Sequence, residues 1–179
     1  MAATLKNKDQ RVAVFIDVQN MYHSAKNLYQ SRVNFGEILK TAVAGRKLIR
    51  AFAYVVRTKT GEEKPFFDAL TNLGIETRVK DLQEYYGGLK KADWDVGIAV
   101  DAIKTSDSVD AMVIVSGDGD FAPLIEYLQN HGKRVEAMAF GKSTSSKIRE
   151  VADEFIDLEA PADKYLLKQK RKWPVPLFH

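Results

Sequence analysis

Carboxylates follow two apolar stretches of this sequence that are typical of buried strands. The run Val12–Ile16 ends at Asp17, and the run Ala111–Val115 is followed by the motif Ser-Gly-Asp-Gly-Asp at residues 116–120. If both strands lie centrally in one parallel sheet, these acids converge at one edge, where a divalent cation most simply relieves their repulsion. Each motif alone is more typical of a turn or a helix N-cap. Because both follow an apolar strand, the pair favours metal-dependent chemistry.

A further carboxylate comes from a predicted helix over residues 94–104, whose apolar run Ile98–Val100 indicates burial. Asp95 falls in its first turn, where the helix dipole favours a carboxylate that could also face a cation. Asp101 lies six residues later, about 120° round the helix, so the two cannot share the centre of one face. Asp95 is the better ligand candidate, and Asp101 is either at the site margin or an ordinary buried polar residue.

The residue types available favour a hard divalent cation over zinc. The chain of 179 residues contains no cysteine, and its three histidines show no metal-ligand spacing with one another. Oxygen ligands suit Mg²⁺ or Mn²⁺ better than Zn²⁺. One or two such ions activate water and compensate the developing charge in phosphodiester hydrolysis. We therefore expect Mg²⁺ or Mn²⁺ as the cofactor.

Strands and helices must alternate along the chain to position these acids. Apolar, β-branched runs predict strands at residues 12–16, 48–56, 75–79, 111–115, 135–140 and 155–158. Helical spacing predicts helices at residues 20–29, 34–45, 62–73, 94–104, 121–130 and 145–152. Asn34 and Glu37 resemble a capping box, and residues 81–91 are expected to form a polar loop or hairpin. This alternation predicts an α/β fold, with a parallel sheet covered on both faces by helices.

Taken together, these motifs resemble the NYN domain, a branch of the PIN-like nucleases, and within it the LabA-like group. The resemblance covers about residues 11–158 and rests on five segments: FIDVQN (15–20), KKADWDVGIAVDAI (90–103), VSGDGDFAPLI (115–125), GKRVEAMAF (132–140) and ADEFIDL (152–158). It implies a PIN-like Rossmannoid three-layer sandwich with a central parallel sheet of five or six strands in the order 3-2-1-4-5. It also implies an acidic site that hydrolyses phosphodiester bonds in RNA with Mg²⁺ or Mn²⁺.

The resemblance places five residues at the catalytic positions of the family: Asp17, Asn20, Asp95, Asp118 and Asp120. The four aspartates are expected to be direct or water-mediated metal ligands. Lys91 matches a recurring basic position of the family and is expected to contact substrate.

Further side chains follow predicted strands and are candidate substrate contacts. Asn20 and Ser116 could orient a ligand or the scissile phosphate by hydrogen bonding, although Ser116 equally suits a plain turn. Arg57 could steer a polyanion, and Ser143 and Thr144 could contact a phosphate at the rim of the site. For Arg57, a solvated loop is an equally good explanation.

Positive charge is concentrated at the C-terminal end of the chain. Residues 159–179 hold five basic and two acidic side chains, which accounts for the net charge of +3. We divide the chain into an N-terminal tail (1–10), an NYN domain (11–158) and this basic tail (159–179), with a terminal helix predicted over residues 161–172. Such a tail either attracts polyanions without sequence preference or is only solvated.

We expect a cytoplasmic protein that binds single-stranded RNA and no membrane, and we leave a homodimer open. No run approaches the roughly 20 apolar residues that span a bilayer, and the first ten residues lack the apolar core of a signal peptide. The main alternative is a regulatory module that binds nucleic acid or protein and retains the acidic pocket with little catalysis. A third is a phosphoesterase for small phosphate compounds, as in Toprim domains, although their first strand normally ends in glutamate.

Overall fold

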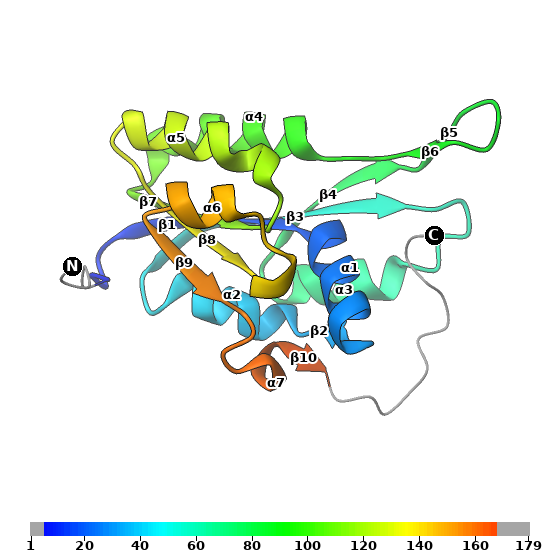
Figure 1. Ribbon diagram of the computed structural model, residues 1–179, viewed down its shortest axis with the longest axis horizontal. Coiled ribbons are helices and arrows are strands. Elements are labelled where there is room, and N and C mark those ends of the chain that lie inside the picture. The colour runs from blue at the N-terminus through cyan, green and yellow to red at the C-terminus, as the bar shows by residue number, and fades with distance from the viewer. Residues whose placement is uncertain (1–5, 168–179) are drawn as a thin grey trace.

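A parallel sheet of six strands runs through the centre of the computed structural model, which describes residues 6–167 (Figure 1). Its order is β4-β3-β1-β7-β8-β9, and every neighbouring pair is parallel. The strands are β1 (Arg11–Asp17), β3 (Lys47–Arg57), β4 (Glu76–Asp81), β7 (Ala111–Val115), β8 (Arg134–Ala139) and β9 (Glu154–Asp157). Counted among these strands alone, the order is 3-2-1-4-5-6, so the expected order is confirmed with a sixth strand at one edge.

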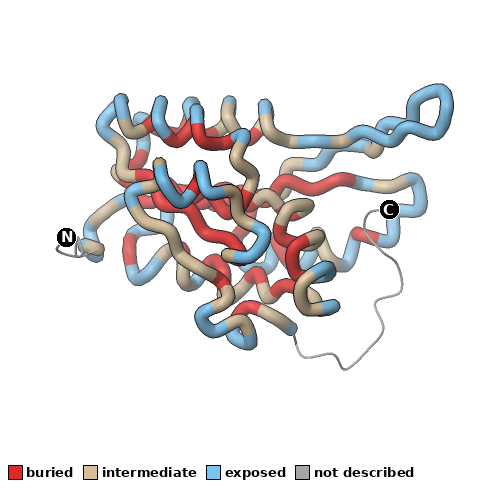
Figure 2. The backbone as a smooth tube through the Cα atoms, in the orientation of Figure 1, coloured by how far each residue is buried: buried red, intermediate tan, exposed pale blue. Residues whose placement is uncertain are grey.

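Both faces of the sheet are buried, which explains why its central strands are apolar without alternation. Val12, Val14 and Ile16 of β1 pack into one core cluster, whereas Ala13 and Phe15 pack into a second cluster on the other face. Figure 2 shows the buried positions concentrated in the sheet and on the inner sides of the helices. The protein is therefore a three-layer α/β sandwich.

Each face of the sheet is covered by three helices, none of them longer than twelve residues. The first core cluster is completed by α1 (Val18–Tyr29), α2 (Phe35–Val43) and α3 (Lys64–Asn72). The second is completed by α4 (Asp95–Thr105), α5 (Ala122–Asn130) and α6 (Ser146–Val151). Three short 3₁₀ helices lie between the larger elements: η1 (Ser106–Ser108), η2 (Gly119–Phe121) and η3 (Gly141–Ser143). None of the helices in residues 6–167 is long and apolar enough to cross a membrane.

Two small antiparallel pairs lie outside the main sheet. Strands β5 (Gln83–Glu84) and β6 (Lys90–Lys91) form the hairpin expected in residues 81–91, and it extends beyond the body (Figure 1). Strands β2 (Arg32–Val33) and β10 (Leu166–Leu167) form the other pair.

In the described part of the chain, the terminal helix expected over residues 161–172 is limited to a single turn. Helix α7 (Ala162–Tyr165) has only four residues, and β10 follows it directly. Tyr165 is buried in the first core cluster, and its hydroxyl lies 3.1 Å from that of Thr41. Residues up to 167 therefore pack on the body, because pairing with β2 and burial of Tyr165 stabilise an extended end. Residues 168–172 lie outside the described part.

A buried ion pair joins the opposite, amino-terminal edge of the sheet to α2. Glu136 of β8 is fully buried and accepts two hydrogen bonds of 2.9 Å from the Arg46 guanidinium. Although burial opposes ionisation, the bonds and charge of Arg46, together with Lys6 and Arg134, hold the pKa of Glu136 below its usual value. This pair fixes the loop that leads into β3.

Candidate functional site

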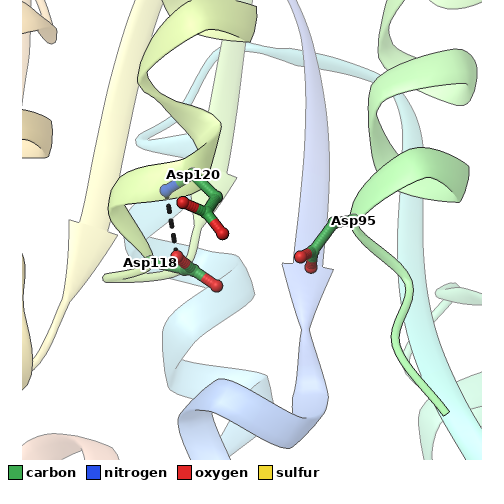
Figure 3. Close-up of side chains that lie close together, drawn as sticks. All are labelled: Asp95, Asp118 and Asp120. Carbon is green, nitrogen blue, oxygen red and sulfur yellow. Dashed lines mark hydrogen bonds between the residues drawn. The ribbon is translucent and has the colours of Figure 1, made fainter. Parts of the chain in front are cut away.

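Three carboxylates meet at the carboxyl edge of the sheet. Asp118 follows β7, Asp120 lies within η2, and Asp95 is the first residue of α4. Each of the three offers a carboxylate oxygen, and these oxygens all lie within 4.8 Å of one another. Figure 3 shows Asp118 and Asp120 facing Asp95 across the end of β1. Residues more than twenty positions apart in the chain thus form one acidic cluster.

Asp17, the last residue of β1, lies beside this cluster but is held by the protein itself. Its Oδ1 accepts from the backbone N–H of Asn20 at 3.1 Å, which caps α1, and its Oδ2 accepts from the Ser116 hydroxyl at 3.0 Å. Burial, aided by the charges of Asp95 and Asp118, raises the pKa of Asp17 to about 6, against the lowering effect of those two hydrogen bonds. Asp17 therefore shares the electrostatic field of the cluster without being one of its three mutually close carboxylates.

The Ser-Gly-Asp-Gly-Asp loop is held in place by side chains of its own and of α1. Asn20 Oδ1 accepts from the backbone N–H of Gly117 at 3.0 Å, which ties α1 to the loop. Ser116 Oγ accepts from the backbone N–H of Asp118 at 3.2 Å, and Asp118 Oδ1 accepts from that of Asp120 at 2.9 Å. The carboxylate of Asp118 is thereby oriented by the turn in which it stands.

Both glycines of this loop are required by close packing against the chain that follows β8. A Cβ atom on Gly117 would lie 2.9 Å from Thr144 Oγ1 and 3.1 Å from the carbonyl oxygen of Ser143. A Cβ atom on Gly119 would lie 2.6 Å from Ser145 Oγ. The contacts with Thr144 Oγ1 and Ser145 Oγ are shorter than real Cβ atoms make, so in a larger residue either these side chains or the loop would have to shift.

The start of α4 is fixed by Trp94, whose indole Nε1–H donates to the carbonyl oxygen of Val55 at 2.9 Å. Lys80 Nζ lies 4.4 Å from the centre of the Trp94 ring and donates to the carbonyl oxygen of Asp93 at 2.8 Å. Burial, followed by the charges of Asp118, Asp93 and Asp120, raises the pKa of Asp95, whereas Lys80 lowers it. Lys80 is thus a cation that favours the ionised form of Asp95.

An open cavity of about 410 Å³ adjoins the acids and gives them access to a ligand. It is lined by Asp17, Asp95 and Asp118 on one side and by polar residues of α1 on the other. The expected convergence of Asp17 and Asp118 is therefore what the fold produces.

The polar residues of α1 that line the cavity are Gln19, Asn20, His23, Ser24 and Asn27. Asn20, His23, Ser24 and Asn27 are spaced three and four residues apart, which puts them on one face of the helix. This polar face is visible in the sequence, but of its residues only Asn20 was predicted to belong to the site. Burial, together with the charge of Lys26, lowers the pKa of His23. His23 therefore lies on the cavity wall, where burial favours its neutral form.

Two expected substrate contacts lie near the cavity, at the chain that follows β8. Ser143 lines the cavity, and its hydroxyl donates to Ser24 Oγ at 2.8 Å. Thr144 donates to the carbonyl oxygen of Phe140 at 2.8 Å, so its hydroxyl is engaged within the turn.

Three other candidates do not line the cavity. Arg57 is exposed and pairs with Asp81 at 2.8 Å. Lys91 is exposed in the β5–β6 hairpin, with Asp93 at 3.7 Å. Asp101 accepts from the Tyr54 hydroxyl at 3.0 Å and from Arg78 at 3.1 Å, as an ordinary partly buried acid does.

The donor set of the cluster fits a hard divalent cation. All three close ligands are carboxylates, and neither cysteine nor histidine belongs to the cluster within residues 6–167. Oxygen donors of this kind are preferred by Mg²⁺ and Mn²⁺. A cation would also relieve the mutual repulsion that adds to burial in raising the pKa of Asp95.

Comparison with known proteins gives three findings on relationship and fold. The NYN domain model matches residues 11–159. The low amplitude and bright protein LabA of Synechococcus elongatus is 27% identical over 166 residues, covering 84% of this chain and 85% of LabA. The crystal structure of a protein of unknown function from Vibrio parahaemolyticus is 30% identical, with a TM-score of 0.81, and covers 92% of this chain and all of the other.

Proposed function

Because this chain belongs to the NYN domain family of the PIN-like nuclease superfamily, we propose that it is a metal-dependent nuclease that hydrolyses phosphodiester bonds in RNA. The observation that carries this proposal is the meeting of Asp95, Asp118 and Asp120 within 4.8 Å beside an open cavity. Such a concentration of negative charge repels a polyanion unless positive charge is added. A nucleic acid can therefore approach these carboxylates only when a bound cation compensates their charge.

Asp95, Asp118 and Asp120 are the residues that would hold Mg²⁺ or Mn²⁺. When bound, such a cation supplies charge compensation for the phosphate and lowers the pKa of water, as hydrolysis at neutral pH requires. Asp17 adds negative charge next to the cluster. Because both of its oxygens accept hydrogen bonds from the protein, it would act on the cation through a bound water or through its charge alone. Its second contribution is to hold Ser116, and with it the loop that carries Asp118.

Other residues of the cavity position the substrate and the loop. Asn20 uses its carbonyl oxygen on Gly117, so its remaining amide N–H groups are the part that can donate to a phosphate oxygen. His23, on the same face of α1, is a further polar residue of the cavity wall. Lys80, which lies over the ring of Trp94 in the cavity wall, attracts the phosphate backbone without reading sequence.

Cleavage of end-labelled single-stranded RNA in the presence of Mn²⁺ tests this function. The wild type should cleave, EDTA should stop cleavage, and Asp118→Asn should lose activity by at least about 100-fold, because removing one electrostatic group of an active site costs that much. Asp107→Asn is the matched control, since Asp107 is an exposed acid in η1 outside the cluster.

Equal cleavage by the wild type and Asp118→Asn would identify a contaminating nuclease and remove the proposal. Equal binding of RNA with and without EDTA, with no product, would instead support the regulatory binding module. Cleavage of small phosphoesters but not of RNA would support a phosphoesterase. The same preparation therefore separates all three functions.

A further inference from the structure

A second cavity of about 410 Å³, here called the apolar groove, lies on the other side of α1 from the acids. Val18 of α1 lines the groove, whereas Asn20 and His23 line the acidic cavity, in keeping with the rotation of about 100° per residue in a helix. Helices α2 and α3 and the β2–β10 pair form the rest of its wall. Its lining is dominated by apolar side chains, among them Val33, Phe35, Phe66, Leu70, Leu73 and Leu167.

Part of this lining is open to solvent in the described part of the chain. Leu73 is 43% exposed and Leu167 is 37% exposed, and Ala69, which also lines the groove, is exposed. Single exposed apolar residues are common on protein surfaces, but a concave group of them marks a surface that binds an apolar partner.

The chain itself is led to the rim of the groove. Leu166 and Leu167 pair with Val33 and Arg32 in antiparallel register, and the Ser31 hydroxyl donates to the carbonyl oxygen of Leu167 at 3.0 Å. Leu167 is both the last described residue and part of the groove lining. Whatever follows Leu167 in the sequence therefore starts next to this apolar surface.

The twelve residues that follow have a composition that suits the groove. Residues 168–172 are Lys-Gln-Lys-Arg-Lys, and residues 173–178 are Trp-Pro-Val-Pro-Leu-Phe. The two prolines lack backbone N–H groups and favour extended backbone, so the apolar stretch has few backbone donors to satisfy and alternate side chains can face one surface. The five polar residues can span up to about 17 Å, at roughly 3.4 Å per residue, which leaves the stretch within reach.

We propose that the segment Trp173–Phe178 of this chain binds in the apolar groove. The binding would cover Leu73 and Ala69 and hold α1 from the side opposite the acids. It would also keep the basic residues 168–172 on the surface of the body. This inference concerns a different surface from the acidic cavity and does not depend on nuclease activity.

Single thiols provide the test, because the chain contains no cysteine. Ala69→Cys places a thiol in the groove, and Asn72→Cys places one on an exposed position of α3 that does not line it. The thiol of Ala69→Cys should react with a thiol reagent at least about tenfold more slowly in the otherwise unchanged chain than in a chain that also carries Trp173→Ser and Leu177→Ser. Tenfold protection corresponds to roughly 90% occupancy of the groove. The reaction at position 72 should not change.

Equal rates at position 69 with and without the two serine substitutions would overturn the proposal. Protection that increases with protein concentration would place the segment of a second copy in the groove, which also overturns it. Fluorescence gives a second readout, since Trp94→Phe leaves Trp173 as the sole tryptophan. Its emission should be shielded from acrylamide, and Ala69→Glu should remove the shielding whereas Asn72→Glu should not; a fully quenchable Trp173 would contradict the binding.

Discussion

Replacing Asp95 by asparagine should stabilise the metal-free protein and remove most of its stabilisation by divalent metal. Asp95 stands half-buried at the first position of α4, within 4.8 Å of carboxylate oxygens of Asp118 and Asp120. Its pKa is raised by burial and then by those charges, so its ionised form is held at a cost in the folded state. Asparagine keeps the size of the side chain and removes the charge.

The magnitude follows from the spacing of the charges. Two carboxylates 4.8 Å apart repel by about 1 kcal/mol in water and by about 3 kcal/mol at an effective dielectric constant near 20. Asp120 is exposed, so its share lies near the lower value. Loss of the favourable helix-dipole interaction returns about 0.5 kcal/mol. A net gain of about 1 to 2 kcal/mol is therefore expected at low ionic strength.

Urea unfolding followed by circular dichroism measures both parts of this prediction. In EDTA, Asp95→Asn should have the higher free energy of unfolding. With Mn²⁺ at about 100 times its dissociation constant, the wild type should gain roughly 2.7 kcal/mol, and Asp95→Asn should gain far less. The gain of the variant in EDTA should also shrink at high salt, because salt screens the repulsion that it removes.

The control is Asp107→Asn, which removes an exposed charge beyond the other end of α4. It should respond to Mn²⁺ as the wild type does. A less stable Asp95→Asn in EDTA, or an equal response of Asp95→Asn and the wild type to Mn²⁺, would refute the electrostatic account of the cluster.

Three further predictions concern the buried ion pair, the loop and the basic residues. Glu136→Gln should lower the free energy of unfolding by about 3 kcal/mol, since Arg46 loses its buried partner. Because the folded-state pKa of Glu136 lies below its usual 4.5, its contribution to the free energy of unfolding is complete above pH 4.5 and is lost as the pH falls through the folded-state pKa. The free energy of unfolding of the variant should therefore depend less on pH in acid. Gly117→Ala should reduce RNA cleavage by about 100-fold at little cost in folding, as measured by kinetics and circular dichroism, because its Cβ would meet Thr144 Oγ1 at 2.9 Å and displace the loop. Replacing the four cations in residues 168–172 by glutamine should reduce the salt slope of RNA binding by up to about 3, and an unchanged slope would show that they are only solvated.

The sheet could be predicted from the sequence because its central strands are buried on both faces. The runs Val12–Ile16 and Ala111–Val115 are apolar at every position, and each becomes a fully buried strand. Local hydrogen bonds were readable too, since Asn34 Oδ1 accepts from the backbone N–H of Glu37 at 3.2 Å. Both signals depend only on neighbouring residues or on burial.

Pairing between short segments far apart in the chain could not be predicted from the sequence. The two-residue strands Arg32–Val33 and Leu166–Leu167 stabilise each other, and neither is long enough to show a pattern alone. Their pairing gives an extended end at residues where we expected a terminal helix to continue. Local propensity therefore loses to a tertiary partner here.

The acids of the site could be predicted, but their individual roles could not. Parallel strands bring Asp17 and Asp118 to one sheet edge, so their convergence follows from topology. That Asp17 is engaged by Asn20 and Ser116 depends on side-chain directions, which the sequence does not carry. Likewise Lys80 reaches Trp94 because of the register of β4, and no motif marks it.

Calorimetric titration of the metal-free protein with Mn²⁺ tests the central claim most directly. The wild type and Asp107→Asn should bind Mn²⁺ with the same saturable heat, and Asp118→Asn should bind it at least about tenfold more weakly, since it loses one of three close carboxylates. Identical binding by all three proteins, or no binding by the wild type, would contradict a cation site formed by Asp95, Asp118 and Asp120.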